Sequence, residues 1–223
     1  MKRLAVLSIL LAVVSILSSS VLAATVDIAG YMGLLTPGYW GIRLYGEGFE
    51  EGFQVVKGTD GQVVNKWYEK SGSGWTFDSS DVFKVTAATL VHIGTNDGKD
   101  LWTFSPIPTI PRHMALNEAY TYSGVMTNQR THATQHYIFV FVVTKSGLTV
   151  NTTAGTFHDC IQTQTYEYTP GQSRESTSLM GPGRADLKTW VSKIEHTSNP
   201  ELETQDVFSA ELTRFGNSNP PFP

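Results

Sequence analysis

The residue pair best suited to chemistry is a histidine and a cysteine two positions apart. His158 and Cys160 lie in a predicted strand, where alternate residues point to the same face. Imidazole and thiolate are ligands that zinc and copper accept, so the pair could hold a metal if a neighbouring strand supplied a third ligand. The sequence names no third ligand, and a lone cysteine is usually inert packing. We therefore predict no metal and no cofactor, with His158 and Cys160 as the only candidate ligands.

The recurrent catalytic motifs are absent from the sequence. It contains no Gly-x-Ser-x-Gly elbow, no His-Glu-x-x-His zinc motif, no phosphate-binding glycine loop and no Cys-x-x-Cys pair. The 20 acidic residues leave room for a hydrolase with paired carboxylates, but no pair stands out along the chain. We predict no catalytic residue, and an enzyme is the third choice of function.

Aromatic residues give the stronger signal. The chain has 5 Trp, 9 Tyr and 11 Phe, spread over separate predicted strands. Such side chains either fill the core of a sheet or line a site for an apolar molecule. Strand position alone selects five candidates for lining a ligand site: Trp40, Trp67, Trp102, Tyr137 and Phe139.

Strands must position these side chains. Turn signals recur about every 8 to 14 residues, which is typical of an antiparallel β architecture. Asp60-Gly61 predicts a hairpin turn, and residues 137–143 are apolar at every position, as in a strand covered on both faces. Strands are expected at residues 39–45, 49–57, 62–70, 75–78, 82–95, 100–105, 117–127, 137–143, 148–153, 157–169, 174–180, 185–195 and 202–215.

The fold class that follows is all-β with little helix. We expect a curved antiparallel sheet, a half-barrel meander, forming a single mature domain over residues 24–215. Residues 106–111 contain three prolines, which lack the N–H that a central ladder needs, so this segment is expected at a crossover or an edge. Residues 216–223 are polar and rich in proline and are expected to be a disordered tail.

The first 23 residues have the pattern of a secretory signal peptide. Lys2 and Arg3 precede an apolar run, and small residues lead to a cleavage site after Ala23. The run is shorter than the roughly 20 apolar residues that span a bilayer. No cysteine follows Ala23 to accept a lipid. We expect a soluble product in the periplasm or outside the cell that does not span a membrane.

Charge narrows the range of partners. The chain carries 16 basic and 20 acidic residues and has a net charge of −4, and the basic residues are scattered. Nucleic-acid binding needs a clustered basic face, so it is not expected. A polybasic attachment to anionic lipid is equally unsupported.

Two segments resemble a group of exported bacterial β-rich proteins of uncharacterised function. The first is Ala154-Gly155-Thr156-Phe157, followed by Asp159-Cys160, and the second is the Gly181-Pro182-Gly183 turn that leads into Lys188. These proteins look similar to the lipoprotein-carrier superfamily of the LolA and LppX type. The resemblance implies a curved antiparallel sheet. It carries over no functional residue, because the matching positions serve turns and packing.

Two functions are then open. The preferred one is a non-enzymatic, exported binding protein that holds a lipid or another hydrophobic ligand against the concave sheet. The alternative is a structural or protein-interaction module of the cell envelope that docks a partner through strand edges or loops.

Overall fold

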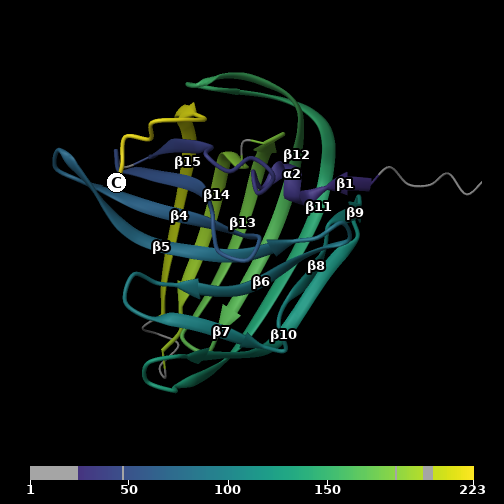
Figure 1. The fold of residues 1–223 in the computed structure, drawn as a ribbon, viewed down its shortest axis with the longest axis vertical. Coiled ribbons are helices and arrows are strands. Elements are labelled where there is room, and N and C mark those ends of the chain that lie inside the picture. The colour runs from purple at the N-terminus through teal and green to yellow at the C-terminus, as the bar shows by residue number, and fades with distance from the viewer. Residues whose placement is uncertain (1–24, 47, 184, 198–202) are drawn as a thin grey trace, which may run out of the picture.

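The computed structural model describes residues 25–46, 48–183, 185–197 and 203–223. The predicted signal peptide, residues 1–23, lies outside the described residues. Most of the described chain is strand, with one helical turn, as the sequence predicted (Figure 1). The elements are β1 (Thr25–Asp27), α2 (Ile28–Tyr31), β2 (Trp40–Tyr45), β3 (Glu50–Lys57), β4 (Gln62–Ser71), β5 (Gly74–Val85), β6 (Thr89–Asn96), β7 (Leu101–Ser105), β8 (Thr109–Pro111), β9 (His113–Ala115), β10 (Ala119–Asn128), β11 (Thr134–Thr152), β12 (Gly155–Thr169), β13 (Gln172–Gly181), β14 (Ala185–Glu195) and β15 (Thr204–Gly216).

The sheet is a closed barrel, which corrects the half-barrel that we expected. Its order among the described residues is β5-β4-β3-β2-β15-β14-β13-β12-β11-β10-β7-β6, with β8 attached to β6, and every pair between these neighbours is antiparallel. A further antiparallel pairing of β5 with β6 joins the two ends into a ring of 12 strands. The short β1 pairs separately with β9.

Closure depends on a turn that the sequence did not reveal. The expected strand over residues 82–95 is two strands, because the chain reverses at Thr86, whose hydroxyl accepts hydrogen bonds from the backbone N–H groups of Ala88 and Thr89. Such local side-chain bonds compete with the strand ladder. The reversal lets Val82 pair with Gly94, which in turn pairs with β7.

Two other local predictions have clear outcomes. Asp60 and Gly61 both have positive φ, 52° and 74°, so the predicted hairpin turn is confirmed. The break that we expected at residues 144–147 is instead a set of register shifts within the 19-residue strand β11. Bulges of this kind bend a strand without ending it.

The barrel is flattened into two halves that cross. In Figure 1, β4 to β7 run roughly horizontally, and β11 to β15 run roughly vertically behind them. The core lies between these halves and beneath the segment that contains α2, where Ile28, Leu34, Tyr39 and Phe53 are fully buried. Asp27 accepts two hydrogen bonds from Arg112, which holds the α2 segment against the strand end near β9.

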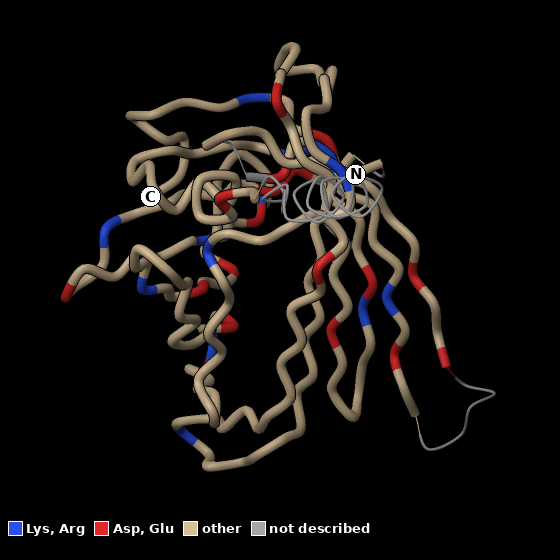
Figure 2. The backbone as a smooth tube through the Cα atoms, turned by 90° about the vertical axis from the view of Figure 1, so that its right-hand side faces the viewer, with Lys and Arg blue, Asp and Glu red and all other residues tan. Residues whose placement is uncertain are grey.

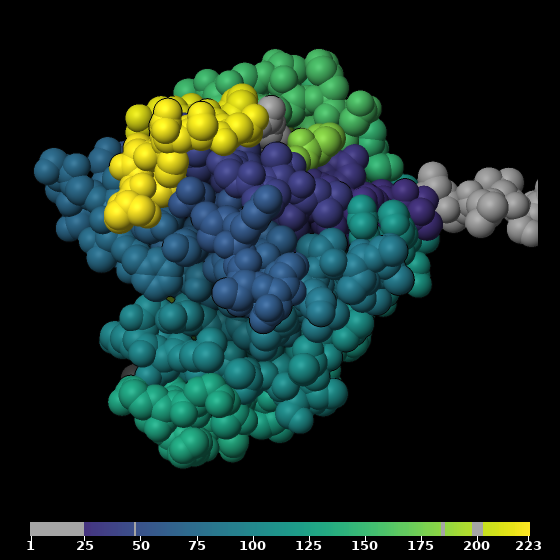
Figure 3. All heavy atoms as spheres, in the orientation of Figure 1, coloured from purple at the N-terminus to yellow at the C-terminus, as the bar shows by residue number. Residues whose placement is uncertain are grey.

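The last residues are ordered, in contrast to the disordered tail that we expected. Phe222 is buried against Tyr68 and Trp75 on the outer surface of the barrel, where its apolar ring leaves water. Figure 3 shows this C-terminal segment, in yellow, lying over the N-terminal strands. No helix in the described part of the chain is both long and apolar enough to cross a membrane.

Candidate functional site: a cavity inside the barrel

A partly open cavity of about 460 Å³ lies inside the barrel between its two halves. This volume lies within the range of about 300 to 1,000 Å³ that is usual for small-molecule sites. The front wall comes from β4 to β8, the back wall from β11 to β14, and Met32 projects from the segment after α2. Because strand side chains alternate between faces, each strand contributes every second residue to the cavity.

The front wall and β11 are aromatic. Trp67, Phe83, Phe104, Tyr137 and Phe139 all line the cavity. Their rings are packed in contact: the Phe104 and Tyr137 centroids are 5.5 Å apart, and Trp67 lies 5.4 Å from the buried ring of Phe53. Tilted pairs at such distances are favourable arrangements of aromatic rings. The aromatic surface is therefore held in a fixed shape.

The back wall carries a set of hydroxyl groups on β12 and β13. Thr163, Thr165, Ser176 and Ser178 line the cavity from β12 and β13. The hydroxyls of Thr165 and Ser176 are 2.5 Å apart, and that of Ser178 lies 2.9 Å from the hydroxyl of Thr189. The cavity therefore has one face suited to apolar groups and another suited to hydrogen bonding.

An acid and a histidine lie together on the front wall. The Asp81 carboxylate accepts a hydrogen bond from the Thr95 hydroxyl at 2.7 Å and lies 3.1 Å from His92 Nε2. Burial disfavours the charged form of Asp81, but the bond to His92 and the bond from Thr95 leave its pKa below the ordinary value. His92 is stacked between Phe83 and Phe104, with both centroids at 4.7 Å. Thr95 and Asp81 contact the same ring nitrogen, which is not the geometry of a nucleophile–base–acid relay.

A second acid faces this pair from the back wall. Burial raises the pKa of Glu167, against the opposing effect of Arg174, its direct neighbour across β12 and β13. Burial also raises the pKa of Tyr137, with Glu167 and then Asp81 adding to the effect. Asp81 and Glu167 thus influence each other across the cavity, and one is held charged while the other is driven toward its neutral form.

Two buried polar atoms in the lining have no hydrogen-bond partner. They are the Asn65 Oδ1 acceptor and the Arg174 Nε donor. Buried polar groups are nearly always paired, with protein, water or ligand. Both atoms are almost inaccessible to solvent, so an occupant of the cavity would pair with them only after their side chains move.

A buried ion triad supports the wall beside Trp67. Arg43 is 6% exposed and pairs with Glu51 and, at 3.0 Å, with Asp186, which lines the cavity. Its guanidinium lies 4.8 Å from the Trp67 ring centroid. Burial would lower the pKa of Arg43, but the adjacent Glu51 carboxylate raises it, so the guanidinium stays charged. Arg43 therefore holds the indole face and the Asp186 carboxylate in place.

The structure brings three of the five predicted ligand-site residues together. Trp67, Tyr137 and Phe139 line the cavity. Trp40 lies outside, where its indole N–H donates to the Ser218 carbonyl, and Trp102 donates to Asp97 away from the cavity. The sequence analysis missed Asn65, Asp81, Glu167 and Arg174. A signal was present for two of them, because Asn65 precedes Trp67, and Asp81 precedes Phe83, by the two positions that place side chains on one face.

His158 and Cys160 do not share a face, contrary to our expectation. Asp159 between them has a positive φ of 55°, which interrupts the alternation of the strand. His158 is exposed beside Thr149, whereas Cys160 is fully buried and burial raises the pKa of its thiol. No group of three or more potential metal-ligating side chains occurs in the part of the chain that the structure describes.

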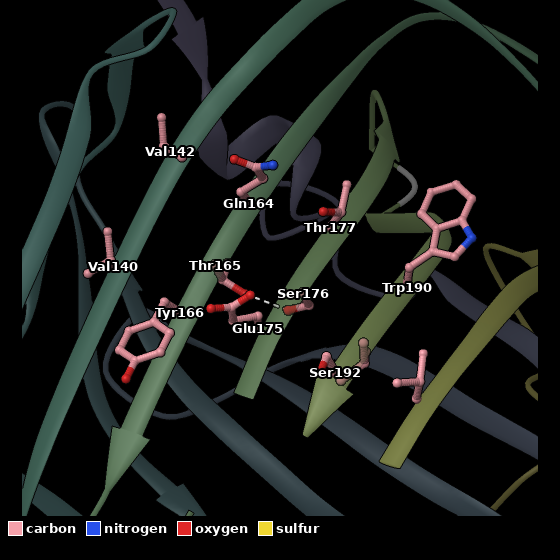
Figure 4. A pocket seen from close by; sticks show the side chains of 12 residues that line it. Val140, Val142, Gln164, Thr165, Tyr166, Glu175, Ser176, Thr177, Trp190 and Ser192 are labelled. Carbon is pink, nitrogen blue, oxygen red and sulfur yellow. Dashed lines mark hydrogen bonds between the residues drawn. The ribbon is translucent and has the colours of Figure 1, made fainter. Parts of the chain in front are cut away.

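The outer surface offers a shallower alternative. A groove of about 480 Å³ crosses β11 to β15 and is lined by Val140, Val142, Tyr166 and Trp190 (Figure 4). Trp190 is 46% exposed. The buried polar atoms without partners belong to residues that line the inner cavity and not this groove.

Basic residues are scattered among acidic ones over the described chain, as Figure 2 shows.

Comparison with known proteins assigns the chain no family and no role. No family model and no curated protein matches the chain. One similar solved structure is a protein from Parabacteroides distasonis ATCC 8503, provisionally described as a lipoprotein, with 12% identity, a TM-score of 0.43, and coverage of 81% of this chain and 96% of that one. Another is from Bacteroides fragilis NCTC 9343, provisionally described as exported with a YmcC-like fold, with 11% identity, a TM-score of 0.47 and the same coverage. The resemblance to the LolA and LppX type stays a prediction.

Proposed function

We propose that the protein is an exported binding protein that holds one amphiphilic small molecule inside its barrel. The observation that carries the proposal is the mixed lining of the cavity, with aromatic rings on the front wall and β11 and hydroxyl groups on β12 and β13. An apolar chain or ring would contact Trp67 and Tyr137, and burying its surface would supply most of the affinity. Export rests on the signal-peptide pattern of residues 1–23.

The unpaired atoms define the polar end of the ligand. Pairing Arg174 Nε takes an acceptor and pairing Asn65 Oδ1 takes a donor, and a hydroxyl group of a ligand serves as either. Asp81, Glu167 and Asp186 line the cavity beside one guanidinium, that of Arg174, and the charged Asp81 carboxylate disfavours a carboxylate or phosphate head group near it. The proposed ligand is therefore a neutral amphiphile and not a bare hydrocarbon or a fatty acid.

A set of alkyl compounds that differ only in the head group tests this proposal. Titration of tryptophan fluorescence should show the tightest binding for a monoacylglycerol, with the carboxylate of the same chain length at least tenfold weaker. Ser178→Phe fills the cavity and should abolish binding, whereas Thr177→Phe, on the outer face of the same strand, should leave it intact. Equal binding in the two variants would place the ligand outside the barrel and refute the proposal.

The second candidate function is docking of an envelope protein on the outer groove. The exposed Trp190 and Val207, which is 74% exposed, favour it. Pairing through barrel strand edges, which we considered from the sequence, loses its basis because the ring is closed. Pull-down from envelope extracts with wild type and Trp190→Ala should recover a partner with wild type alone.

A further inference from the structure

The outer surface of the barrel has a second aromatic cluster, separate from the cavity. It contains Trp40 on β2, Tyr68 on β4 and Trp75 on β5, and we call it the tail slot. These residues form a core cluster of their own with Ile42 and Phe222. Tyr68 and Trp67 are consecutive, so one faces the slot and the other the cavity. The slot therefore has its own binding surface on the other side of the sheet.

One side chain fills the tail slot. The Phe222 ring stacks on Tyr68 with centroids 4.5 Å apart and an interplanar angle of 20°, and it meets Trp75 and Trp40 edge-on at 5.5 Å and 6.2 Å. Phe222 is only 5% exposed, whereas Pro221 and Pro223 on either side of it are exposed. The contact is thus a single phenylalanine held between proline neighbours.

The slot is shaped for this ring. Gly52 forms its floor, because a Cβ atom at that position would lie 2.6 Å from the Phe222 ring. Two polar contacts fix the direction of the segment: the Tyr68 hydroxyl donates to the Pro223 carbonyl at 3.0 Å, and the Trp40 indole donates to the Ser218 carbonyl at 2.9 Å. Trp40, Gly52, Tyr68 and Trp75 all lie on strands of the barrel, which gives the slot a rigid frame.

The tail is held by side-chain contacts and not by strand pairing. Beyond Gly216 the described chain has left the β15 ladder, and Pro220, Pro221 and Pro223 have no N–H with which to pair. Segments with few buried contacts open at low free-energy cost relative to the whole molecule. Release of the tail would expose a preformed aromatic slot.

We propose that the tail slot is a peptide-recognition site for an extended segment with a proline-flanked phenylalanine, filled in this structure by the chain's own tail. Aromatic slots on rigid strands are a recurrent way of recognising proline-rich peptides. A tethered segment competes at an effective concentration in the millimolar range, so the chain's own tail keeps the slot closed against weak ligands. The site is independent of the cavity and of the function proposed for it.

The test uses the full chain with its slot emptied by Phe222→Ala. A synthetic peptide with the sequence of residues 217–223 should bind this variant saturably, monitored by the fluorescence of Trp40 and Trp75. Wild type should bind the peptide at least tenfold more weakly, because its own tail competes. A peptide with alanine in place of its phenylalanine should not bind.

A blocked slot provides the matched control. Phe222→Ala combined with Gly52→Val should lose peptide binding, and circular dichroism should show that it keeps its β structure. If this variant does not fold, Phe222→Ala with Tyr68→Ala serves in its place, since it removes the stacking surface without adding bulk. No saturable binding to folded Phe222→Ala, or equal binding of the alanine peptide, would overturn the proposal.

Discussion

At the residue scale, the cavity is defined by ionisable groups whose surroundings push them in opposite directions. Asp81 has two hydrogen-bonding neighbours and a lowered pKa, whereas Glu167 is buried with a raised pKa. This contrast between the two pKa shifts is not visible in the sequence, because Asp81 and Glu167 come from strands far apart in the chain. Binding-site polarity of this kind results from folding and not from local spacing.

Glu167→Gln should stabilise the protein at neutral pH. A carboxyl whose pKa is raised by folding binds protons more tightly in the folded state, so its contribution to stability falls as pH rises from about 4.3 through the folded pKa. The variant should therefore have a higher free energy of unfolding than wild type at pH 8 and about the same at pH 4. Urea unfolding at the two pH values measures this.

Glu175→Gln is the matched control for that comparison. Glu175 is the exposed residue that follows Arg174 on β13, and its replacement should change stability little at either pH. A Glu167→Gln variant that is less stable than wild type by the same amount at both pH values would contradict the assigned direction.

Arg43→Leu should be strongly destabilising. It leaves the carboxylates of Glu51 and Asp186 without their buried partner, a change that typically costs about 3–5 kcal/mol. Arg214→Leu, which removes an exposed ion pair with Glu50, should cost about 1 kcal/mol or less. Chemical unfolding measures the free energy of unfolding of both variants. Equal losses of this free energy would show that the buried Arg43 ion pairs contribute no more than the exposed pair.

At the scale of elements, local patterns predicted most strands but not how they close. The Asp60-Gly61 turn and the positions of β2, β3, β12 and β14 follow from turn chemistry and alternation. The ring depends on a hydroxyl-supported reversal at Thr86 and on pairing between β5 and β6, and the tail depends on one phenylalanine. Tertiary contacts like these override what a local segment prefers.

Gly94→Ala should weaken the closing seam. Gly94 pairs with both β5 and β7, and a Cβ atom there would lie 2.7 Å from the backbone oxygen of Trp102, which cannot turn aside as a side chain can. Overpacking of this kind costs about 1–3 kcal/mol. Gly171→Ala, with open space around it, should be within about 0.5 kcal/mol of wild type. Equal unfolding free energies for the two variants would argue against a tight seam.

At the scale of the whole molecule, pairing of the two ends of the sheet makes a barrel with a cavity inside it. We expected aromatic side chains on an open concave face, and the structure places three of the five named residues in a partly open cavity inside the barrel, beside acids and hydroxyls. This narrows the proposed ligand from a lipid or another hydrophobic molecule to one with a hydrogen-bonding end. It also leaves the outer face free for the separate tail slot.

Native mass spectrometry of the protein purified from its source tests the central claim most directly. Wild type and Thr177→Phe should each carry one small molecule per chain, and Ser178→Phe, whose bulk fills the cavity, should appear at its bare mass. A small molecule retained equally by all three, or bare masses throughout even after incubation with neutral amphiphiles, would contradict a ligand-binding barrel.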